Sequence, residues 1–199
     1  GLAAAHDDPA VPFISWGYHP LWHGEIWRDE LNAWFGDQPV VLWHRSFHEI
    51  IANDAALTQL GIDEALTRSI HEANWERGHF YEGGLKAIVP KLAFLFEPAR
   101  FGQGMQNFMA MTHRAGVTTV LDMGTGIFGN PRREIAGIRT VAEAYPVPTR
   151  IILTPIILDF ISRGVAPEAA VAEVRSWQAE NSPRVQVGNH FKLMLDGAI

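Results

Sequence analysis

The feature that most constrains the fold is an alternation of strand-like and helix-like segments in the second half of the chain. Aliphatic and β-branched runs cover 117–124, 148–158 and 185–197, and helical patterns that open on a proline cover 131–145 and 166–180. This spacing predicts βαβ units and a parallel sheet. Right-handed crossovers place the helices on one side if such a sheet curls into a barrel. The spacing alone leaves a barrel and an open sheet equally possible.

The first half of the chain is less regular. Strand patterns occur at 11–18 and 39–45, the second β-branched and opened by Pro39. Helical patterns occur at 28–35, 48–62, 84–96 and 99–114. Gly36, Gly61 and Gly116 stand where helix-ending glycines are expected, and Pro90 predicts a kink or boundary.

Composition excludes several classes of function. The 199 residues carry a formal net charge of -6 and no basic stripe, which argues against a nucleic-acid partner. Cysteine is absent, so disulfides and thiolate chemistry are excluded. No apolar run approaches the roughly 18 residues of a membrane span. We expect no membrane partner and a cytoplasmic location, with a secreted or periplasmic parent protein left open. Because residue 1 is Gly, we expect a processed chain or a piece of a longer one.

A glycine-rich segment, "GTGIFG", follows the first strand of the second half. Gly124, Gly126 and Gly129 match the spacing of a dinucleotide-binding loop. That motif requires an acidic residue at the end of the next strand, where this chain has Thr154 and Pro155. We therefore favour an ordinary βα loop and keep nucleotide binding as a further alternative.

Two histidine pairs have a spacing that can serve a metal. His19/His23 and His44/His48 are each four residues apart. Neither pair lies clearly within one helix, and His19 precedes Pro20, which disfavours helix at that point. Local hydrogen bonding or a pocket wall is the favoured interpretation.

The closing segment "NHFKLMLDG" places polar residues in a run predicted to be a strand. Alternation puts Phe191, Leu193 and Leu195 on one face and gives the other face His190, Lys192, Met194 and Asp196. A polar face in a covered parallel strand indicates a site, and barrel interiors provide such a face. Burial favours the neutral amine of lysine, which can act as a base, form a Schiff base or react with CO₂. Alternatively, Lys192 reaches solvent or pairs with Asp196.

Three segments resemble the YtcJ-like amidohydrolases of amidohydrolase family 3, a group that includes proteins named exoenzyme regulatory proteins. They are "PVVLWHRSFHEIIANDAALTQLGI", "AGVTTVLDMG" and "NHFKLMLDGAI", and the resemblance spans 39–199. It implies a metal-dependent hydrolase of amide-like C–N bonds on a TIM-type (β/α)₈ barrel. One or two divalent metals, zinc above all, would activate the water that attacks the carbonyl.

The resemblance also assigns roles to single residues. Lys192 matches the metal-bridging lysine, which is often carbamylated. His48 and Asp196 match catalytic positions, and His48 is expected to face the substrate. Asn53 and Asp122 are expected to line the substrate pocket, together with His190, which alternation places on the same strand face as Lys192. The chain departs from the family where D-G-H is replaced by Ser46-Phe47-His48, and where the H-x-H motif is absent.

These observations predict an internal segment of a longer enzyme. An irregular α+β insert would cover 1–98, and a partial barrel of about three βα units would cover 99–199, with strands near 117–123, 148–157 and 185–196. The whole protein would bind a divalent metal and a small amide-like substrate. The segment itself is expected to lack tightly bound metal and activity, and to form homo-oligomers through exposed strand edges. The alternative is a non-catalytic regulatory or binding protein on an amidohydrolase scaffold.

Overall fold

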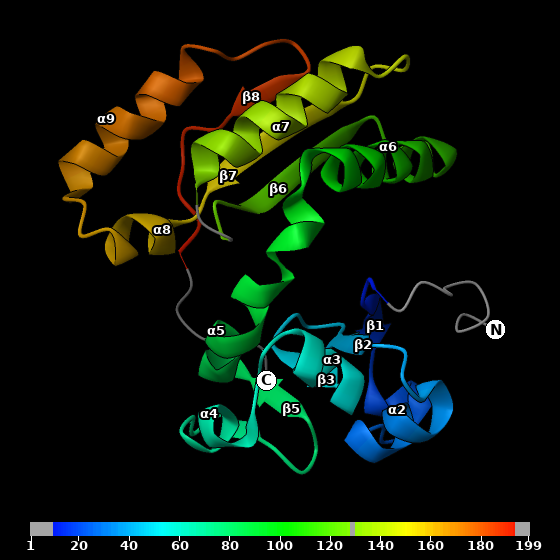
Figure 1. The fold of residues 1–199 in the computed structure, drawn as a ribbon. Coiled ribbons are helices and arrows are strands. Elements are labelled where there is room, and N and C mark those ends of the chain that lie inside the picture. Colours follow the sequence, from blue (N-terminus) through cyan, green and yellow to red (C-terminus); the bar gives the residue numbers. More distant parts are fainter. Residues whose placement is uncertain (1–9, 128–129, 194–199) are drawn as a thin grey trace. The chain divides into compact units, whose positions relative to one another are not determined.

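The computed structural model describes residues 10–127 and 130–193. These residues form two compact units, 10–93 and 94–193 (Figure 1). Within these residues no helix is both long and apolar enough to cross a membrane. The division into an insert and a partial barrel at residue 98 stays a prediction.

The first unit is built on a five-stranded mixed sheet in the order β1-β2-β3-β5-β4. The strands are β1 (Phe13–Tyr18), β2 (Val40–His44), β3 (Glu49–Ala52), β4 (Ala73–Asn74) and β5 (His79–Tyr81). β1 and β2 are parallel, and the remaining pairs are antiparallel. The helices are α1 (Pro20–His23), α2 (Arg28–Phe35), α3 (Asp54–Gln59), α4 (Glu64–Arg68) and α5 (Leu85–Ile88). Short 3₁₀ segments, η2 (Glu82–Gly84) and η3 (Val89–Phe96), flank α5.

Two helices expected in this unit are corrected by the structure. The run 48–62 is not one helix: β3 comes first, and α3 begins only at Asp54. Ile50 and Ile51 are both buried and pair with β2, and periodicity cannot distinguish such a short apolar run from a helix. The run 84–96 has only one α-helical turn before it becomes 3₁₀, at the point where Pro90 lacks an N–H donor.

The second unit contains the parallel sheet that the strand–helix alternation predicts. Its order is β6 (Thr119–Thr125), β7 (Arg150–Pro155) and β8 (Val185–Val187), and both pairs are parallel. The helices are α6 (Pro98–Arg114), α7 (Pro131–Ala144), α8 (Ile157–Ser162) and α9 (Pro167–Gln178). Proline stands at the start of α6, α7 and α9, where its fixed φ suits the first turn.

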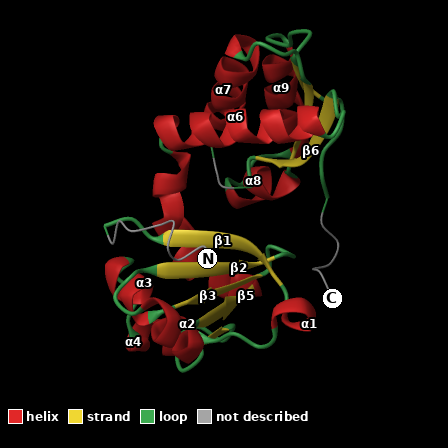
Figure 2. Ribbon diagram, turned by 90° about the vertical axis from the view of Figure 1, so that its right-hand side faces the viewer, coloured by secondary structure: helices red, strands yellow, loops and turns green. Residues whose placement is uncertain are grey.

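The helices of this unit pack on one face of the sheet. Ile151, Leu153, Val185 and Val187 alternate along β7 and β8 and share a buried core with side chains of α6, α7, α8 and α9. Figure 2 shows α6, α7 and α9 on the same side of the strands. On β6, Leu121 is 50% and Met123 43% exposed, and register with Ile152 assigns Leu121 to the other face. One-sided cover is the arrangement of a barrel wall, whereas an open doubly wound sheet has helices on both faces.

The last predicted strand is shorter than expected. β8 ends at Val187, although we predicted a strand to residue 196, and 194–196 lie outside the described residues. Leu153 pairs with Val187 and Ile156 with Lys192, so two residues of β7 stand opposite the four residues 188–191. Gly188 and Asn189 favour a turn, which the Gln178 amide holds by donating to the Gly188 carbonyl (2.8 Å) and the Asn189 Oδ1 (2.7 Å).

Candidate functional site

Lys192 returns to strand register at the carboxyl end of β7. Its N–H donates to the Pro155 carbonyl at 2.8 Å, and its own carbonyl accepts from the Ile157 N–H at 3.0 Å. The preceding residue, Phe191, packs edge-on against Phe160 in the helix-side core, with ring centroids 5.5 Å apart. Because neighbouring extended residues point to opposite faces, Lys192 is assigned to the face away from the helices. Functional groups of parallel α/β folds collect at this carboxyl edge.

His190 lies at the same edge. Its Nε2 is 3.2 Å from the hydroxyl oxygen of Thr154, which is fully buried near the end of β7. His190 itself is exposed, in the four-residue interruption before Lys192. The turn thus brings His190, Thr154 and the half-buried residue Lys192 to one end of β7 and β8, whereas alternation predicts an unbroken strand there.

Asp122 has a different environment from the one expected for a substrate-pocket residue. Its register with Leu153 places it on the helix side of the sheet. The carboxylate accepts from the Gly124 N–H at 3.0 Å and from the Thr125 hydroxyl, so it holds the turn that leaves β6. Its contact with substrate stays a prediction.

A second carboxylate holds the same loop. Glu134 Oε2 in α7 accepts from the Gly126 N–H at 2.9 Å. Burial raises the pKa of Glu134 to about 7, with a further increase from the Asp122 charge, while the hydrogen bond from Gly126 opposes the shift. Gly126 has φ +93°, and a Cβ there would lie 3.1 Å from the Pro131 Cβ. Loop geometry therefore accounts for this glycine without a nucleotide, and Gly129 lies outside the described residues.

In the first unit, His48 follows a strained turn between β2 and β3. Phe47 has φ +67°, in the left-handed region where the family motif has Gly. Its ring stacks on Trp16 at 5.3 Å and meets Trp43 edge-on at 5.5 Å. The His48 Nδ1 lies 3.1 Å and 3.2 Å from the two carboxylate oxygens of Glu82.

Asn53 is fully buried at the start of α3. Its Oδ1 accepts from the N–H groups of Val40 (2.9 Å) and Ala56 (3.0 Å), and its Nδ2 donates to the Gln38 carbonyl (2.8 Å). These bonds join the start of β2 to the first turn of α3. The predicted substrate contact of Asn53 is untested, but its structural role is clear.

The histidine pairs have local partners. The His23 Nδ1 lies 3.2 Å from the His19 backbone nitrogen, and the His19 and His44 rings are 5.0 Å apart. Burial lowers the pKa of His44. In the described part of the chain, no group of three or more His, Cys, Asp or Glu residues is arranged to hold a metal.

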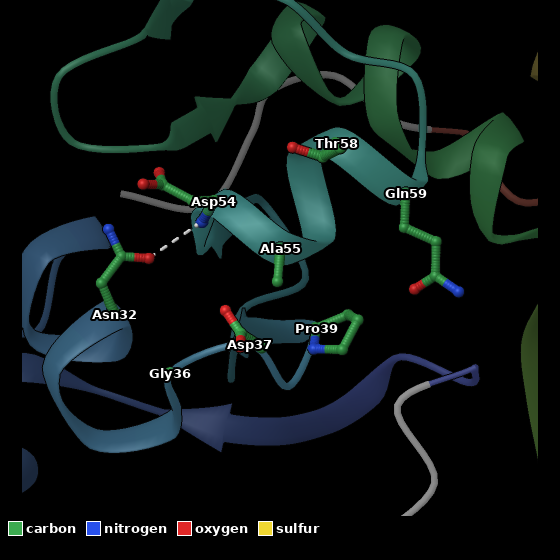
Figure 3. A pocket seen from close by; sticks show the side chains of 8 residues that line it. All are labelled: Asn32, Gly36, Asp37, Pro39, Asp54, Ala55, Thr58 and Gln59. Atoms are coloured by element: carbon green, nitrogen blue, oxygen red, sulfur yellow. Dashed lines mark hydrogen bonds between the residues drawn. The ribbon is translucent and has the colours of Figure 1, made fainter.

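An open depression in the first unit, about 550 Å³ in volume, lies between the end of α2 and α3 (Figure 3). Asp54 is engaged there, because its N–H donates to Asn32 Oδ1 at 3.0 Å and its carboxylate pairs with Arg28. The residues that line the depression are Asn32, Gly36, Asp37, Pro39, Asp54, Ala55, Thr58 and Gln59, and none of the predicted site residues is among them.

The predicted site residues are distributed over the two units. His48 and Asn53 belong to the first, whereas Asp122, His190 and Lys192 belong to the second, and Asp196 lies outside the described residues. Sequence reasoning missed Glu82, Glu134 and Thr154. Glu134 had a signal, since an acidic side chain in a first helical turn can reach back to a loop N–H. Glu82 had none, because its partner is 34 residues away.

Known proteins resemble this chain both in sequence and in fold. A family model described as "Amidohydrolase family" matches residues 14–199. A crystal structure of an uncharacterized metal-dependent hydrolase from Pyrococcus horikoshii OT3 is similar to the chain with a TM-score of 0.53 and 16% identity, over 87% of this chain and 32% of that one. A second, from Pyrococcus furiosus, has a TM-score of 0.50 and 12% identity, over 88% and 33%. The chain thus spans about a third of the length of these structures, and no curated protein matches it.

Proposed function

The chain belongs to the amidohydrolase family, and from this membership we propose that it is a segment of a metal-dependent hydrolase of amide-like C–N bonds. The observation that carries the proposal is the position of Lys192. Its backbone is fixed at the carboxyl end of β7 by hydrogen bonds to Pro155 and Ile157, and alternation from Phe191 assigns its side chain to the face away from the helices. The three segments that resemble the YtcJ-like group support that subgroup within the family.

The second unit fits a partial TIM-type barrel. Its three strands are parallel, and their helices pack on one face. The opposite face carries Leu121, Met123 and Lys192, which is the mixture of apolar wall and polar end expected where further strands would close a barrel. The boundary near residue 98, with an α+β insert before it, belongs to the same proposal.

The residues present supply part of a metal site. Lys192 offers one nitrogen, which a carbamate would convert into two oxygen ligands, and His190 offers an imidazole near the same edge. The described residues do not complete a set of three. The remaining ligands are therefore proposed to come from other parts of the whole protein.

The chain's own residues have distinct tasks in this proposal. Lys192 presents its amine at the carboxyl edge, Thr154 holds the His190 ring, and Asp122 with Glu134 fixes the loop that follows β6. His48 faces the substrate, which is a small amide-like molecule. When bound, a divalent metal such as zinc supplies a water of lowered pKa and polarises the carbonyl.

A non-catalytic role on the same scaffold is favoured by one observation. Phe47, which directly precedes His48 in the chain, occupies a left-handed position that the family motif gives to Gly. Such a change remodels the substrate side of the site and fits a protein that binds without turnover.

An assay of amide hydrolysis by the whole protein distinguishes the hydrolase from the non-catalytic alternative. We expect release of amine from N-acyl substrates after zinc loading, and a loss of at least about 100-fold in Lys192→Ala. Lys91→Ala, in η3, is the matched control and should retain activity. Binding of the same amides without any release of amine would favour the regulatory alternative.

A further inference from the structure

The His48 side chain is held by a carboxylate that neither the motif nor the family resemblance identifies. Both oxygens of Glu82 lie within 3.2 Å of the His48 Nδ1. The side chains are 24% and 47% exposed, so the pair is open to solvent only in part. Their main chains are also joined, because the Glu82 N–H donates to the His48 carbonyl at 3.0 Å.

The chemistry of this contact fixes the state of the ring. An ionised carboxylate only accepts hydrogen bonds, so Nδ1 must carry the proton. In the neutral imidazole, Nε2 is then the nitrogen with the free lone pair. His44 provides a contrast, since its Nδ1 lies 2.7 Å from the Ser46 hydroxyl oxygen and 3.2 Å from the Ser46 backbone nitrogen, and a hydroxyl, unlike a carboxylate, can either donate or accept.

The backbone at this contact is strained on both sides. Phe47, just before His48, has φ +67°, and Glu82 has φ +45°. Left-handed conformations of such residues cost of order 1–3 kcal/mol each, and they persist only where surrounding structure over-determines them. The turn before His48 and the residue that carries the carboxylate therefore both adopt costly conformations around one imidazole.

We propose that Glu82 is a positioning residue for His48, which it holds as the Nδ1–H tautomer with Nε2 free to accept from a substrate N–H or a water. This inference rests on the proposed substrate-facing role of His48. Glu82 acts only through the ring and does not itself contact substrate. Carboxylate–histidine pairs of this kind set both the tautomer and the ring orientation.

Nitrogen NMR of the histidine-labelled chain tests the proposal without any assay of hydrolysis. At about pH 9, where imidazole is neutral, the wild-type His48 should show a protonated Nδ1 and an unprotonated Nε2. Glu82→Gly removes the carboxylate at a position whose φ suits glycine, and it should move the proton to Nε2 in most molecules. Glu82→Asn, which tolerates the same φ without a charge, is the second variant and should have the same effect.

Two controls share the spectrum. His44 should keep its tautomer in both variants. Glu49→Ala should change His79, whose Nε2 lies 2.8 Å from Glu49 Oε2, and should leave His48 unchanged. If His48 retains a protonated Nδ1 in Glu82→Gly and Glu82→Asn, the proposal is overturned.

The whole protein distinguishes this inference from the proposed function. Glu82→Asn should lower kcat about tenfold, with little change in KM. If His48→Ala leaves hydrolysis unchanged while Glu82→Gly still shifts the tautomer, the substrate role of His48 fails and the positioning by Glu82 stands.

Discussion

The backbone N–H of Lys192 donates a 2.8 Å hydrogen bond to the carbonyl oxygen of Pro155. This bond restores strand register after the interruption at 188–191, and Phe191 is buried against Phe160 at the same step. The position of the lysine is therefore set by the core of its own unit.

The Glu134–Gly126 contact predicts a pH-dependent stability. The pKa of Glu134 is about 7 in the folded chain against a usual value of 4.5. Between these values only the folded state binds the proton, so the contribution to stability is complete below pH 4.5 and is lost as pH rises through 7. The loss is up to about 3 kcal/mol.

Denaturant unfolding between pH 4 and 8 measures this effect. Glu134→Gln keeps an acceptor for the Gly126 N–H and should remove most of the slope, which makes the variant more stable than wild type at pH 8. Glu168→Gln, in the exposed first turn of α9, should behave as wild type. An unchanged slope in Glu134→Gln would refute the assignment.

Asn53 is predicted to be essential to the stability of the first unit. Asn53→Ala removes three hydrogen bonds to backbone and should lower the free energy of unfolding by about 2–4 kcal/mol. Asn32→Ala is the matched control, because that side chain accepts one bond, from the Asp54 N–H, and should cost less than about 1 kcal/mol. Equal losses in urea unfolding would argue against the buried role.

The sequence predicts the second unit better than the first. The helices α6, α7 and α9 are long and begin at a proline. The strands β6 and β7 coincide with aliphatic and β-branched runs, so local sequence signals suffice to predict all five elements. The local pattern of Glu49–Ala52 predicts a helix, because its strand conformation depends on pairing with β2 across a turn. The strand predicted to residue 196 ignored the turn signal of Gly188 and Asn189.

The candidate site could be predicted only in part. Lys192 is unusual within an apolar run, but its position beside the end of β7 depends on the turn at 188–191, which an unbroken alternation does not include. The partners of these residues depend on tertiary contacts instead. Glu82 meets His48, and Thr154 meets His190, across separations that no local pattern encodes.

The left-handed turn at Phe47 predicts that glycine is more stable than alanine at this position, which is the reverse of the order in a helix. Glycine adopts φ +67° freely, whereas the Cβ of alanine is crowded in this conformation. Phe47→Gly should therefore be more stable than Phe47→Ala by about 1 kcal/mol. At helical Ala55 the order should be the usual one, with Ala55→Gly less stable than wild type. Thermal or urea unfolding of the variants decides this, and a more stable Phe47→Ala would show that the turn is not left-handed.

The uncovered face of the second unit predicts self-association. Leu121 is 50% and Met123 43% exposed on a strand at the sheet edge, and such surfaces pair with other chains. Light scattering should give a mass above that of the monomer, and Leu121→Ser with Met123→Ser should reduce it. Val171→Ser, on exposed α9, should not. A monomeric wild-type chain would contradict the prediction.

Carbamylation of Lys192 tests the central proposal most directly. The neutral amine would add to the carbon of CO₂ and release one proton, and the chain has only Lys86 and Lys91 as other lysines. The whole, metal-loaded protein equilibrated with ¹³C-bicarbonate should give one carbamate carbon signal in NMR. That signal should be lost in Lys192→Ala and kept when Lys86 or Lys91 is changed to Arg. An active, metal-loaded protein in which Lys192 is unmodified would contradict the assigned role.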